Sequence, residues 1–333
     1  MTADGVSPTG PSTSGPSSAG RSPSDEVDVL AVVGVEPVRR ARIAAQVAHA
    51  AGRALFPAAR LGMALDPLDE ARALVPWAAE QGAVVELPTS VDVTALIAAF
   101  SDGLLTSIVC VVDARRLRAD LFGDQYLRRP APGGGVEHVA AAAVLVSQIE
   151  YASAVALEHW QSLPPVDLAQ VLDLVGHLAP TAQVHLWSGR PPAELGGRDR
   201  RPYGAAQERP GWGAILNGDP LPTVPGGGVD HLRFEQVRPF HPGRLATRPG
   251  TPLRWEHVGS MFSLLAAGDD GDDAAAIGQD LAFIGYDLEA AALDAALDRA
   301  TLDDAELIAG SSTWSGWDEP AELSVEVPGL GRR

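Results

Sequence analysis

The chain has 333 residues, of which 46% are hydrophobic, and a formal net charge of −18. This length is typical of about two domains with a sizeable core. The acidic balance argues against direct binding to nucleic acid, which draws its affinity from clustered Lys and Arg, but it leaves a basic protein as a partner. The single cysteine, Cys110, excludes an internal disulfide, and we expect it to be a buried apolar residue in a reducing cytosol.

The N-terminal segment, residues 1–25, consists largely of Ser, Pro, Thr and Gly in low-complexity order. Such a composition buries too little apolar surface to fold, so a disordered tail is expected. The segment has no apolar core of a signal peptide, and no apolar stretch of the chain is long enough to cross a bilayer. We therefore expect a soluble, cytoplasmic protein without a membrane partner.

Val29 to Val33 form a short apolar run that ends at Gly34. This run is typical of the first parallel strand of an α/β domain, and a helix is expected after it. A phosphate-binding loop at this corner has the sequence Gly-x-x-x-x-Gly-Lys-Ser/Thr, because backbone N–H groups surround the phosphates, the Lys reaches their oxygens and the hydroxyl holds Mg²⁺. Gly34 occupies the first of these positions, but residues 39–41 at the last three are Arg, Arg and Ala.

The residues that replace the loop motif change its chemistry. Arg39 lacks the conformational freedom of glycine, Pro37 removes one backbone N–H, and Ala41 offers no oxygen to a metal. Arg40 still carries a charge that attracts an anion. The alternative is an ordinary strand–turn–helix corner with a solvated basic turn.

The rest of the first half alternates helical and apolar strand patterns. The expected helices are residues 67–81, 91–100, 136–151 and 166–178, and the expected strands are 83–87, 107–112, 152–157 and 184–187. This alternation predicts a parallel sheet with helices on both faces. Asp113 follows the clearest buried strand at the edge where such sheets bind ligands, although a cap for the next helix explains it equally well.

Residues 189–228 are rich in Gly, Pro and Arg and have little periodicity, which indicates a linker or an inserted loop. Beyond them we expect strands at 231–237 and 280–286 and a helix at 289–300, and so a small α+β domain. Asp287 is the expected N-cap of that helix. Its expected packing face consists of Leu288, Ala291, Ala292, Ala295 and Ala296. The acidic residues 267–273 are interpreted as a solvated loop, because the oxygen spacing of a calcium-binding loop is absent.

Four motifs resemble those of one family. They are Arg-Pro-Phe-His-Pro-Gly-Arg-Leu at 238–245, Leu-Ala-Phe-Ile-Gly at 281–285, Val-Val-Asp-Ala at 111–114 and Gln-Ile-Glu-Tyr-Ala at 148–152. With them the chain resembles the CobW family of P-loop GTPases, which pair a nucleotide-binding domain with a small C-terminal domain and are linked to cobalt, zinc or cobalamin metabolism. The resemblance implies a P-loop-NTPase-like parallel sheet domain followed by a small α+β CobW C-terminal domain.

The chain departs from the family at its functional motifs. The guanine-recognition motif Asn-Lys-x-Asp is replaced by Glu158, His159, Trp160 and Gln161, and the Glu-x-x-Gly switch stretch is absent between residues 100 and 107. No cysteine stands near residues 87–91, where the family has Cys-x-Cys-Cys, so thiolate metal binding there is excluded. The eight histidines are scattered without metal-ligand spacing and are expected to be structural or solvated.

The resemblance therefore implies a vestigial nucleotide site without catalytic residues or metal ligands. Its members are Gly34, Arg39, Arg40 and Asp113. No cofactor is expected, and GTP with Mg²⁺ would bind weakly at most. The expected divisions of the chain are a tail at 1–25, a degenerate G domain at 26–188, a linker at 189–228, the CobW C-terminal domain at 229–320 and a tail at 321–333.

The segment Pro-Gly-Trp to Leu-Asn-Gly at 210–218 resembles an actinobacterial branch associated with zinc limitation and with recruiting a hibernation factor to the ribosome. The leading hypothesis is a non-hydrolysing recruitment protein that contacts its partner through the second domain and residues 189–217. If those residues form a mobile insertion, Trp212 packs on its own domain instead. The rival hypotheses are an active GTP-dependent metallochaperone that uses Arg40 in place of the Lys, and a structural or regulatory subunit.

Overall fold

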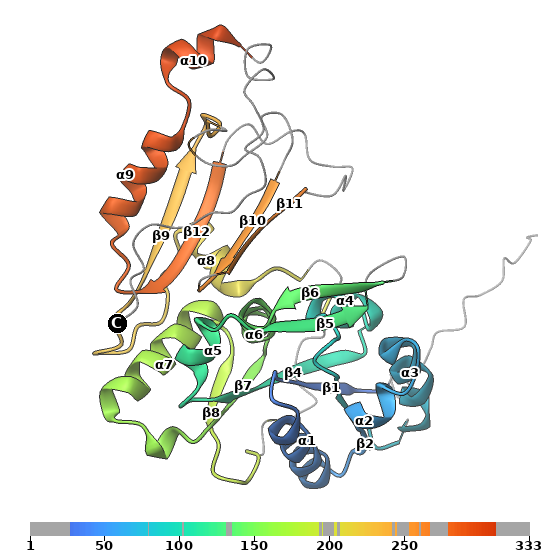
Figure 1. The fold of residues 1–333 in the computed structure, drawn as a ribbon. Helices are drawn as coiled ribbons and strands as arrows, with labels where there is room; N and C mark the ends of the chain where they lie inside the picture. Colours follow the sequence, from blue (N-terminus) through green and yellow to red (C-terminus); the bar gives the residue numbers. More distant parts are fainter. Residues whose placement is uncertain are drawn as a thin grey trace, which may run out of the picture.

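The protein divides into a sheet domain and a C-terminal lobe of antiparallel strands and helices, which lie one above the other in Figure 1. The computed structural model describes residues 27–78, 80–101, 103–130, 135–192, 195, 203–204, 207–241, 244, 253–259, 261–266 and 279–310. The expectations for residues 1–25, 267–273 and 321–333 lie outside the described residues. No helix in the described part of the chain is long and apolar enough to span a membrane.

The sheet domain contains six parallel strands, as the alternating pattern predicted. Their order across the sheet is β2 (Ala54–Phe56), β3 (Ala83–Glu86), β1 (Val29–Val33), β4 (Leu105–Asp113), β7 (Ala154–Glu158) and β8 (Gln183–Leu186). The chain runs from β1 to one side of the sheet and returns to β4 on the other side. The carboxyl ends of β1 and β4 therefore form a topological switch point, where sheets of this kind bind ligands.

Helices cover both faces of the sheet, because successive side chains of each buried strand point to opposite sides. Leu30 and Val32 of β1 pack against α1, whereas Val29 and Val33 pack in the larger core on the opposite face. That core is covered by helices including α3, α4, α6 and α7. The helices are α1 (Pro37–Ala51), α2 (Ala58–Leu61), α3 (Pro67–Leu74), α4 (Val93–Ala99), α5 (Leu117–Leu121), α6 (Ala141–Glu150) and α7 (Pro165–Leu178), with short 3₁₀ turns η1 (Val75–Ala78) and η2 (Trp160–Ser162).

Cys110 lies in the larger core and is fully buried, as predicted. Burial raises the pKa of its thiol, because the charged thiolate is disfavoured in an apolar environment. Cys110 therefore acts as a small apolar side chain.

Two predicted helices are wrong in extent. The first, 67–81, ends as α3 at Leu74, since Pro76 lacks the N–H that an α-helix requires and a 3₁₀ turn follows. In the second, 136–151, the first five residues form strand β6 (Val136–Ala140), which pairs with β5 (Tyr126–Pro130) in an antiparallel hairpin. The β-branched residues of β6 lie opposite residues of β5. The helical periodicity of the segment gave no sign of this pairing.

The C-terminal lobe is built on the antiparallel pair β9 (Val229–Gln236) and β12 (Gln279–Tyr286), with a second pair, β10 (Leu253–Val258) and β11 (Met261–Ala266). Helix α9 (Ala290–Ala300) packs Leu297 against Phe234 and Phe240, and α10 (Asp304–Ala309) follows it. The predicted strands at 231–237 and 280–286 are thus confirmed. The first begins two residues earlier and ends one residue earlier than predicted, and the second begins one residue earlier.

The predicted start and packing face of the last long helix are wrong. Asp287 has φ 49°, and the N-cap of α9 is Glu289, whose side chain makes no capping hydrogen bond. The four alanines of the predicted face are exposed, whereas Leu293 and Leu297 pack on the strands. A leucine buries more apolar area than an alanine, so the two leucines determine which face turns inward.

The joint between the two parts is formed by α7 and residues 210–229. The Asp173 carboxylate, which is buried, accepts hydrogen bonds from the backbone N–H groups of Val224 at 2.8 Å and Val229 at 3.0 Å. The segment predicted as a linker contains helix α8 (Pro210–Asn217), which contacts α7, β9 and β12. A Cβ at Gly211 would lie 2.2 Å from the carbonyl oxygen of His177, so only glycine permits this approach.

Candidate functional site

The structure brings the four predicted site residues together at the switch point. Gly34 follows β1, Arg39 and Arg40 lie in the first turns of α1, and Asp113 ends β4. Gly34 has φ 155°, and a Cβ there would lie 3.0 Å from the carbonyl oxygen of Val111. Both the backbone conformation and the space therefore require glycine.

The loop that would surround a phosphate does not form. Of the eight positions from Gly34 to Ala41, the first three connect β1 to α1 and the last five belong to α1, which begins at Pro37. Proline favours the first position of a helix, because its φ is already helical and its missing N–H would have no partner. The helix therefore starts too early to leave a cradle of free N–H groups.

Glu36 is the N-cap of α1. Its carboxylate accepts hydrogen bonds from the backbone N–H groups of Val38 at 3.2 Å and Arg39 at 3.1 Å. The N-terminus of a helix attracts anions through its unpaired N–H groups and its dipole. Here an anion of the chain itself takes that position.

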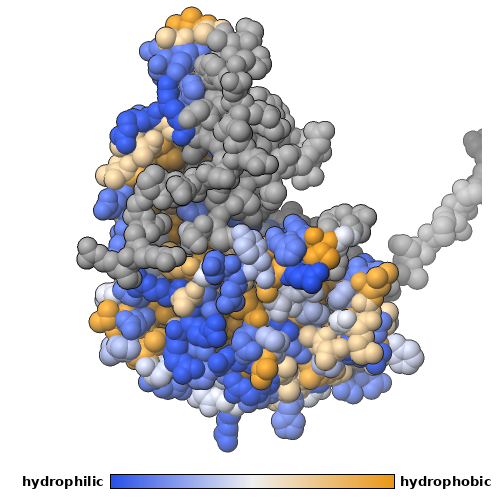
Figure 2. Space-filling model, viewed as in Figure 1, coloured by the Kyte–Doolittle hydropathy of each residue, from blue (hydrophilic) through white to orange (hydrophobic). Residues whose placement is uncertain are grey.

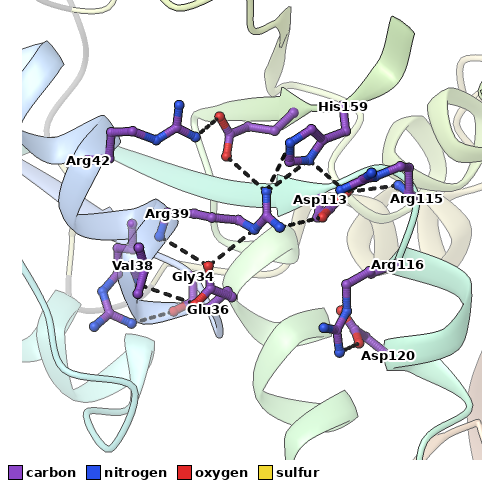
Figure 3. A network of polar contacts seen from close by, with 12 residues as sticks. Gly34, Glu36, Val38, Arg39, Arg42, Asp113, Arg115, Arg116, Asp120 and His159 are labelled. Atoms are coloured by element: carbon purple, nitrogen blue, oxygen red, sulfur yellow. Dashed lines mark hydrogen bonds and ion pairs between the residues drawn. The ribbon is translucent and has the colours of Figure 1, made fainter. Parts of the chain in front are cut away.

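Arg39 is surrounded by carboxylates from three elements (Figure 3). Its Nε lies 3.2 Å from Glu36 Oε2, its Nη2 lies 3.1 Å from Asp113 Oδ2, and its Nη1 lies 3.8 Å from Glu158 Oε2. Nη1 also lies 2.9 Å from Nδ1 of His159. The Arg39 guanidinium is thus held by partners that arrive from the ends of β4 and β7.

Glu158 and His159 also belong to this network. In the sequence they stand only at the positions of a base-recognition motif, which gives no sign of this contact. Glu158 also binds Arg42, and Nδ1 of His159 lies 3.2 Å from Asp113 Oδ1. His159 has φ 55°, a conformation that histidine adopts more often than most side chains. Only the pairing of β4 with β7, which sets Asp113 beside Glu158, reveals the connection.

Asp113 serves as both a cap and an ion partner. Its Oδ1 accepts the backbone N–H of Arg115 at 3.1 Å, which supports the turn that follows β4. Burial alone would raise the pKa of the Asp113 carboxyl. The hydrogen bonds from Arg115 and the charges of Arg39 and His159 outweigh burial and hold that pKa below its usual range. Asp113 is therefore a carboxylate at neutral pH.

Arg40 points away from this network into the protein. It is 3% exposed, and its Nε donates to Glu86 Oε1 at 3.1 Å. Its Nη1 donates to the Gly34 carbonyl at 2.6 Å and to Thr89 Oγ1 at 2.8 Å. Burial lowers the pKa of the Arg40 guanidinium, and the Glu86 carboxylate partly offsets this. Arg40 thus fastens the end of β1 to β3.

At the switch point, three carboxylates lie opposite three guanidinium groups. The carboxylates of Glu36, Asp113 and Glu158 face the guanidinium groups of Arg39, Arg42 and Arg115. A triphosphate is bound where positive charge and backbone N–H groups are in excess. All 25 basic residues of the chain are arginines, so no lysine is available to reach a phosphate.

A cleft of about 210 Å³ lies beside the network, between α5, α6, strand β5 and the end of β4. Val111, Leu117 and Leu145 contribute apolar surface, and Arg39 and Asp120 contribute charged groups. Pockets for ligands of drug size measure about 300–1,000 Å³. The cleft is smaller than this range.

A metal centre does not emerge from the described residues, among which no three His, Cys, Asp or Glu side chains are grouped to hold an ion. Two of the histidines, His177 and His231, have ring centroids 5.7 Å apart. His177 is buried in α7 with Nδ1 2.9 Å from the Asp173 carbonyl, and Nε2 of His241 lies 3.6 Å from Glu306. Trp160 donates to the Trp187 carbonyl at 3.3 Å.

Comparisons with known proteins give a distant structural likeness. No family of known proteins and no curated protein matches the chain by sequence. The solved structure of Zn(II)-bound YjiA GTPase from E. coli is 12% identical with a TM-score of 0.35, and it covers 83% of this chain and 99% of its own. A Zn(II)-bound triple mutant of YjiA GTPase is 14% identical with a TM-score of 0.31, covering 71% and 77%. The fold assignment therefore rests on the sheet topology.

Proposed function

We propose that this chain is a CobW-like protein that does not hydrolyse nucleotide and that acts by binding another protein. The observation that carries the proposal is the Glu36 carboxylate, which bonds the backbone N–H groups of Val38 and Arg39 at the start of α1. A bound phosphate would need those same donors. The residues present do not fit a nucleotide, because an internal carboxylate stands where its phosphate would lie.

Opening the site to a phosphate has a free-energy cost. Glu36 has to give up its role as N-cap, which contributes about 1 kcal/mol. Arg39 has to leave Asp113 and Glu158, whose side chains are each 5% exposed and would lose the cation that lies 3.1 and 3.8 Å from them. The carboxylates left behind would repel a phosphate. Millimolar nucleotide is therefore expected not to displace the internal pairs.

The rival function, a GTP-dependent metallochaperone, requires Arg40 in place of the phosphate-binding lysine. The Arg40 guanidinium is bound to Glu86, Gly34 and Thr89. Turning it toward a nucleotide would leave the buried Glu86 without its cation, at a cost of about 3–5 kcal/mol. The contacts of Arg40 thus support a binding protein over a nucleotide-dependent enzyme.

A recruitment role under zinc limitation, with the ribosome or a hibernation factor as partner, is supported by the resemblance of residues 210–218. In that segment, Gly211 and Ile215 of α8 are buried, whereas Trp212 is 45% exposed beside the joint. Exposed tryptophans are among the residues that dominate the energetics of interfaces. The net charge of −18 favours encounter with a cationic protein.

Affinity purification from zinc-starved actinobacterial cells tests recruitment. Deleting residues 189–217 would remove the buried Leu195 and Tyr203 and damage the fold, so a point variant is the better probe. Trp212→Ala is expected to reduce recovery of ribosomal or hibernation proteins about tenfold. The matched control is Trp77→Ala, because Trp77 is 86% exposed on η1. Recovery of no such protein by the intact chain contradicts recruitment, and equal recovery by both variants contradicts a contact through α8.

The absence of nucleotide binding is tested separately by the melting temperature in GTP or ATP with Mg²⁺. A ligand at 100 times its Kd stabilises the folded state by about 2.7 kcal/mol, which raises the melting temperature by several degrees. We expect no shift at about 1 mM nucleotide. A shift that grows with nucleotide concentration would contradict the proposal.

A further inference from the structure

Helix α8 packs on the joint with one side and exposes the other. Gly211 and Ile215 are buried on the inner side, whereas Trp212 is 45% exposed. In Figure 1 the helix lies between the strands of the C-terminal lobe and the sheet domain. The exposed Glu208 carboxylate lies against the same helix, because a Cβ at Gly213 would meet Glu208 Oε2 at 3.8 Å. An indole and a carboxylate are thus exposed together in the first turns of α8.

The C-terminal end of α8 carries a negative charge that a helix disfavours there. The backbone N–H of Asp219 donates to the Ala214 carbonyl at 2.8 Å, and that of Gly218 donates to the Ile215 carbonyl at 3.2 Å, which is the Schellman motif. An apolar side chain often follows the glycine of this motif, and the carbonyl end of the helix favours a cation. The exposed Asp219 carboxylate meets neither preference, and natural chains break such preferences mainly at functional sites. The three residues Glu208, Trp212 and Asp219 are called the α8 face.

The surroundings of the α8 face are negative after their ion pairs are taken into account. Among the described residues, no arginine or histidine lies within ion-pair distance of its two carboxylates, and Arg209, which precedes α8, lies 3.4 Å from Glu150 Oε2. The elements that α8 contacts, α7, β9 and β12, contain one arginine and no lysine between them. That arginine, Arg233, donates to both carboxylate oxygens of Asp280 at 3.1 Å. Asp230 of β9 adds another exposed carboxylate.

The indole and the carboxylates of the α8 face select the same kind of ligand. On the face of the molecule in Figure 2, hydrophobic residues lie in small groups between strongly hydrophilic ones. The α8 face has the same mixed character, with one large apolar side chain beside two carboxylates. An indole attracts a guanidinium or ammonium group over its ring, and carboxylates attract the same groups. Arginine fits best, because its planar guanidinium stacks on a ring and bonds a carboxylate at two points.

We propose that the α8 face binds an extended, arginine-rich segment of the partner protein. Helix α8 has eight residues and spans about 12 Å, a length that about four residues of an extended segment cover. Arginines four positions apart lie on the same side of such a segment, so they reach the carboxylates at both ends of the helix. A nucleic acid has the same sign of charge as the face and is disfavoured. The inference rests on the proposed function for its premise that the chain binds a protein, and it adds the chemistry of the partner.

Fluorescence titration of the full chain with a labelled peptide that has Arg at every fourth position tests this site. We expect saturable binding that weakens with salt. No binding is expected when citrulline, which keeps the shape of Arg without its charge, replaces each Arg. A peptide of the same composition with its arginines adjacent is expected to bind about threefold more weakly, because it reaches only one end of α8.

Asp219→Lys separates binding from folding, because it reverses the charge of the face in a way that suits the helix. A cation at the C-terminal end of a helix is favoured, so the melting temperature is expected to stay equal or rise. The Kd of the peptide is expected to rise about tenfold. The control Asp69→Lys makes the same charge change at an exposed residue of α3 and is expected to alter the Kd less than about twofold.

A second pair of variants tests the aromatic contact. Trp212→Ala is expected to weaken the peptide about fivefold, whereas Trp77→Ala, at a residue that is 86% exposed on η1, is not expected to weaken it. Failure of the spaced peptide to bind, equal losses from Asp219→Lys and Asp69→Lys, or tighter binding of a labelled single-stranded RNA would each overturn the proposal. These outcomes leave recovery of a partner from zinc-starved cells unaffected, so failure here is distinguishable from failure of the proposed function.

Discussion

Carboxylates make the main polar contacts both at the carboxyl edge of the sheet and at the joint to the C-terminal lobe. Their partners differ between the two places. At the sheet edge, Glu36, Asp113 and Glu158 bind arginine side chains beside a cleft. At the joint, Asp173 binds two backbone N–H groups and is buried. At the edge the carboxylates neutralise the arginines that a ligand would need, whereas at the joint a carboxylate connects two parts of the fold.

The largest effect is expected from removing the buried cation at the edge. Arg40→Met leaves the Glu86 carboxylate, 3% exposed, without its ion pair. Breaking a buried pair by removing one partner costs about 3–5 kcal/mol, which urea denaturation measures as a loss of unfolding free energy. The control Arg60→Met removes an ion pair with Glu70 that is largely exposed and is expected to cost less than about 1 kcal/mol. Equal stability of Arg40→Met and the parent chain would contradict a structural role for Arg40.

The next effect concerns the joint. Asp173→Ala removes the acceptor of two hydrogen bonds, leaving the N–H groups of Val224 and Val229 without it. We expect a loss of about 2–4 kcal/mol and a lower melting temperature by calorimetry. Asp294→Ala, on the exposed side of α9, provides a control that should change stability by less than about 0.5 kcal/mol. If the two variants melt alike, Asp173 does not hold the joint.

Two glycines of α8, Gly211 and Gly213, differ in how closely they approach their neighbours. Gly211→Ala places a Cβ 2.2 Å from the His177 carbonyl oxygen, and overpacking of this kind costs about 1–3 kcal/mol. A Cβ at Gly213 meets its first neighbour at 3.8 Å, so Gly213→Ala is expected to stabilise the helix by about 0.5–1 kcal/mol. Urea midpoints that shift in the same direction for both variants would contradict close packing of α8 on α7.

The pH dependence of stability tests the ion network at the edge. The pKa of Asp113 is lower in the folded state than its usual value near 3.9, so its contribution is fully present above that value and is lost as pH falls through the folded pKa. Asp113→Asn removes this group, and urea midpoints measured between about pH 5 and pH 2 should then fall less steeply. An unchanged slope would show that Asp113 is not stabilised by Arg39 and Arg115.

Much of the sheet was predictable because buried parallel strands form apolar runs. The run from Val29 to Val33 illustrates this, and residues 107–112 give the core of β4. The sequence did not predict the hairpin β5–β6, because pairing between strands depends on tertiary contacts. It also did not predict the packing face of α9, because tertiary contacts decide whether the leucines or the alanines of that helix face the core. Gly34, Arg39 and Arg40 were assigned from the positions of a loop motif and Asp113 from the end of a strand, but the sequence did not indicate their partners. Glu86 and Glu158 reach the arginines only through the order of strands in the sheet.

Calorimetric titration measures whether the Glu36 carboxylate keeps a nucleotide's phosphate from the start of α1. The full chain is titrated with GTP and with ATP in the presence of Mg²⁺, alongside Glu36→Gln, which removes the charge but keeps the size of the cap. We expect no saturable heat for the parent chain up to about 1 mM nucleotide, which corresponds to a binding free energy weaker than about −4 kcal/mol. A micromolar Kd for the parent chain that rises when Arg39 or Arg40 is replaced by Ala would contradict the account.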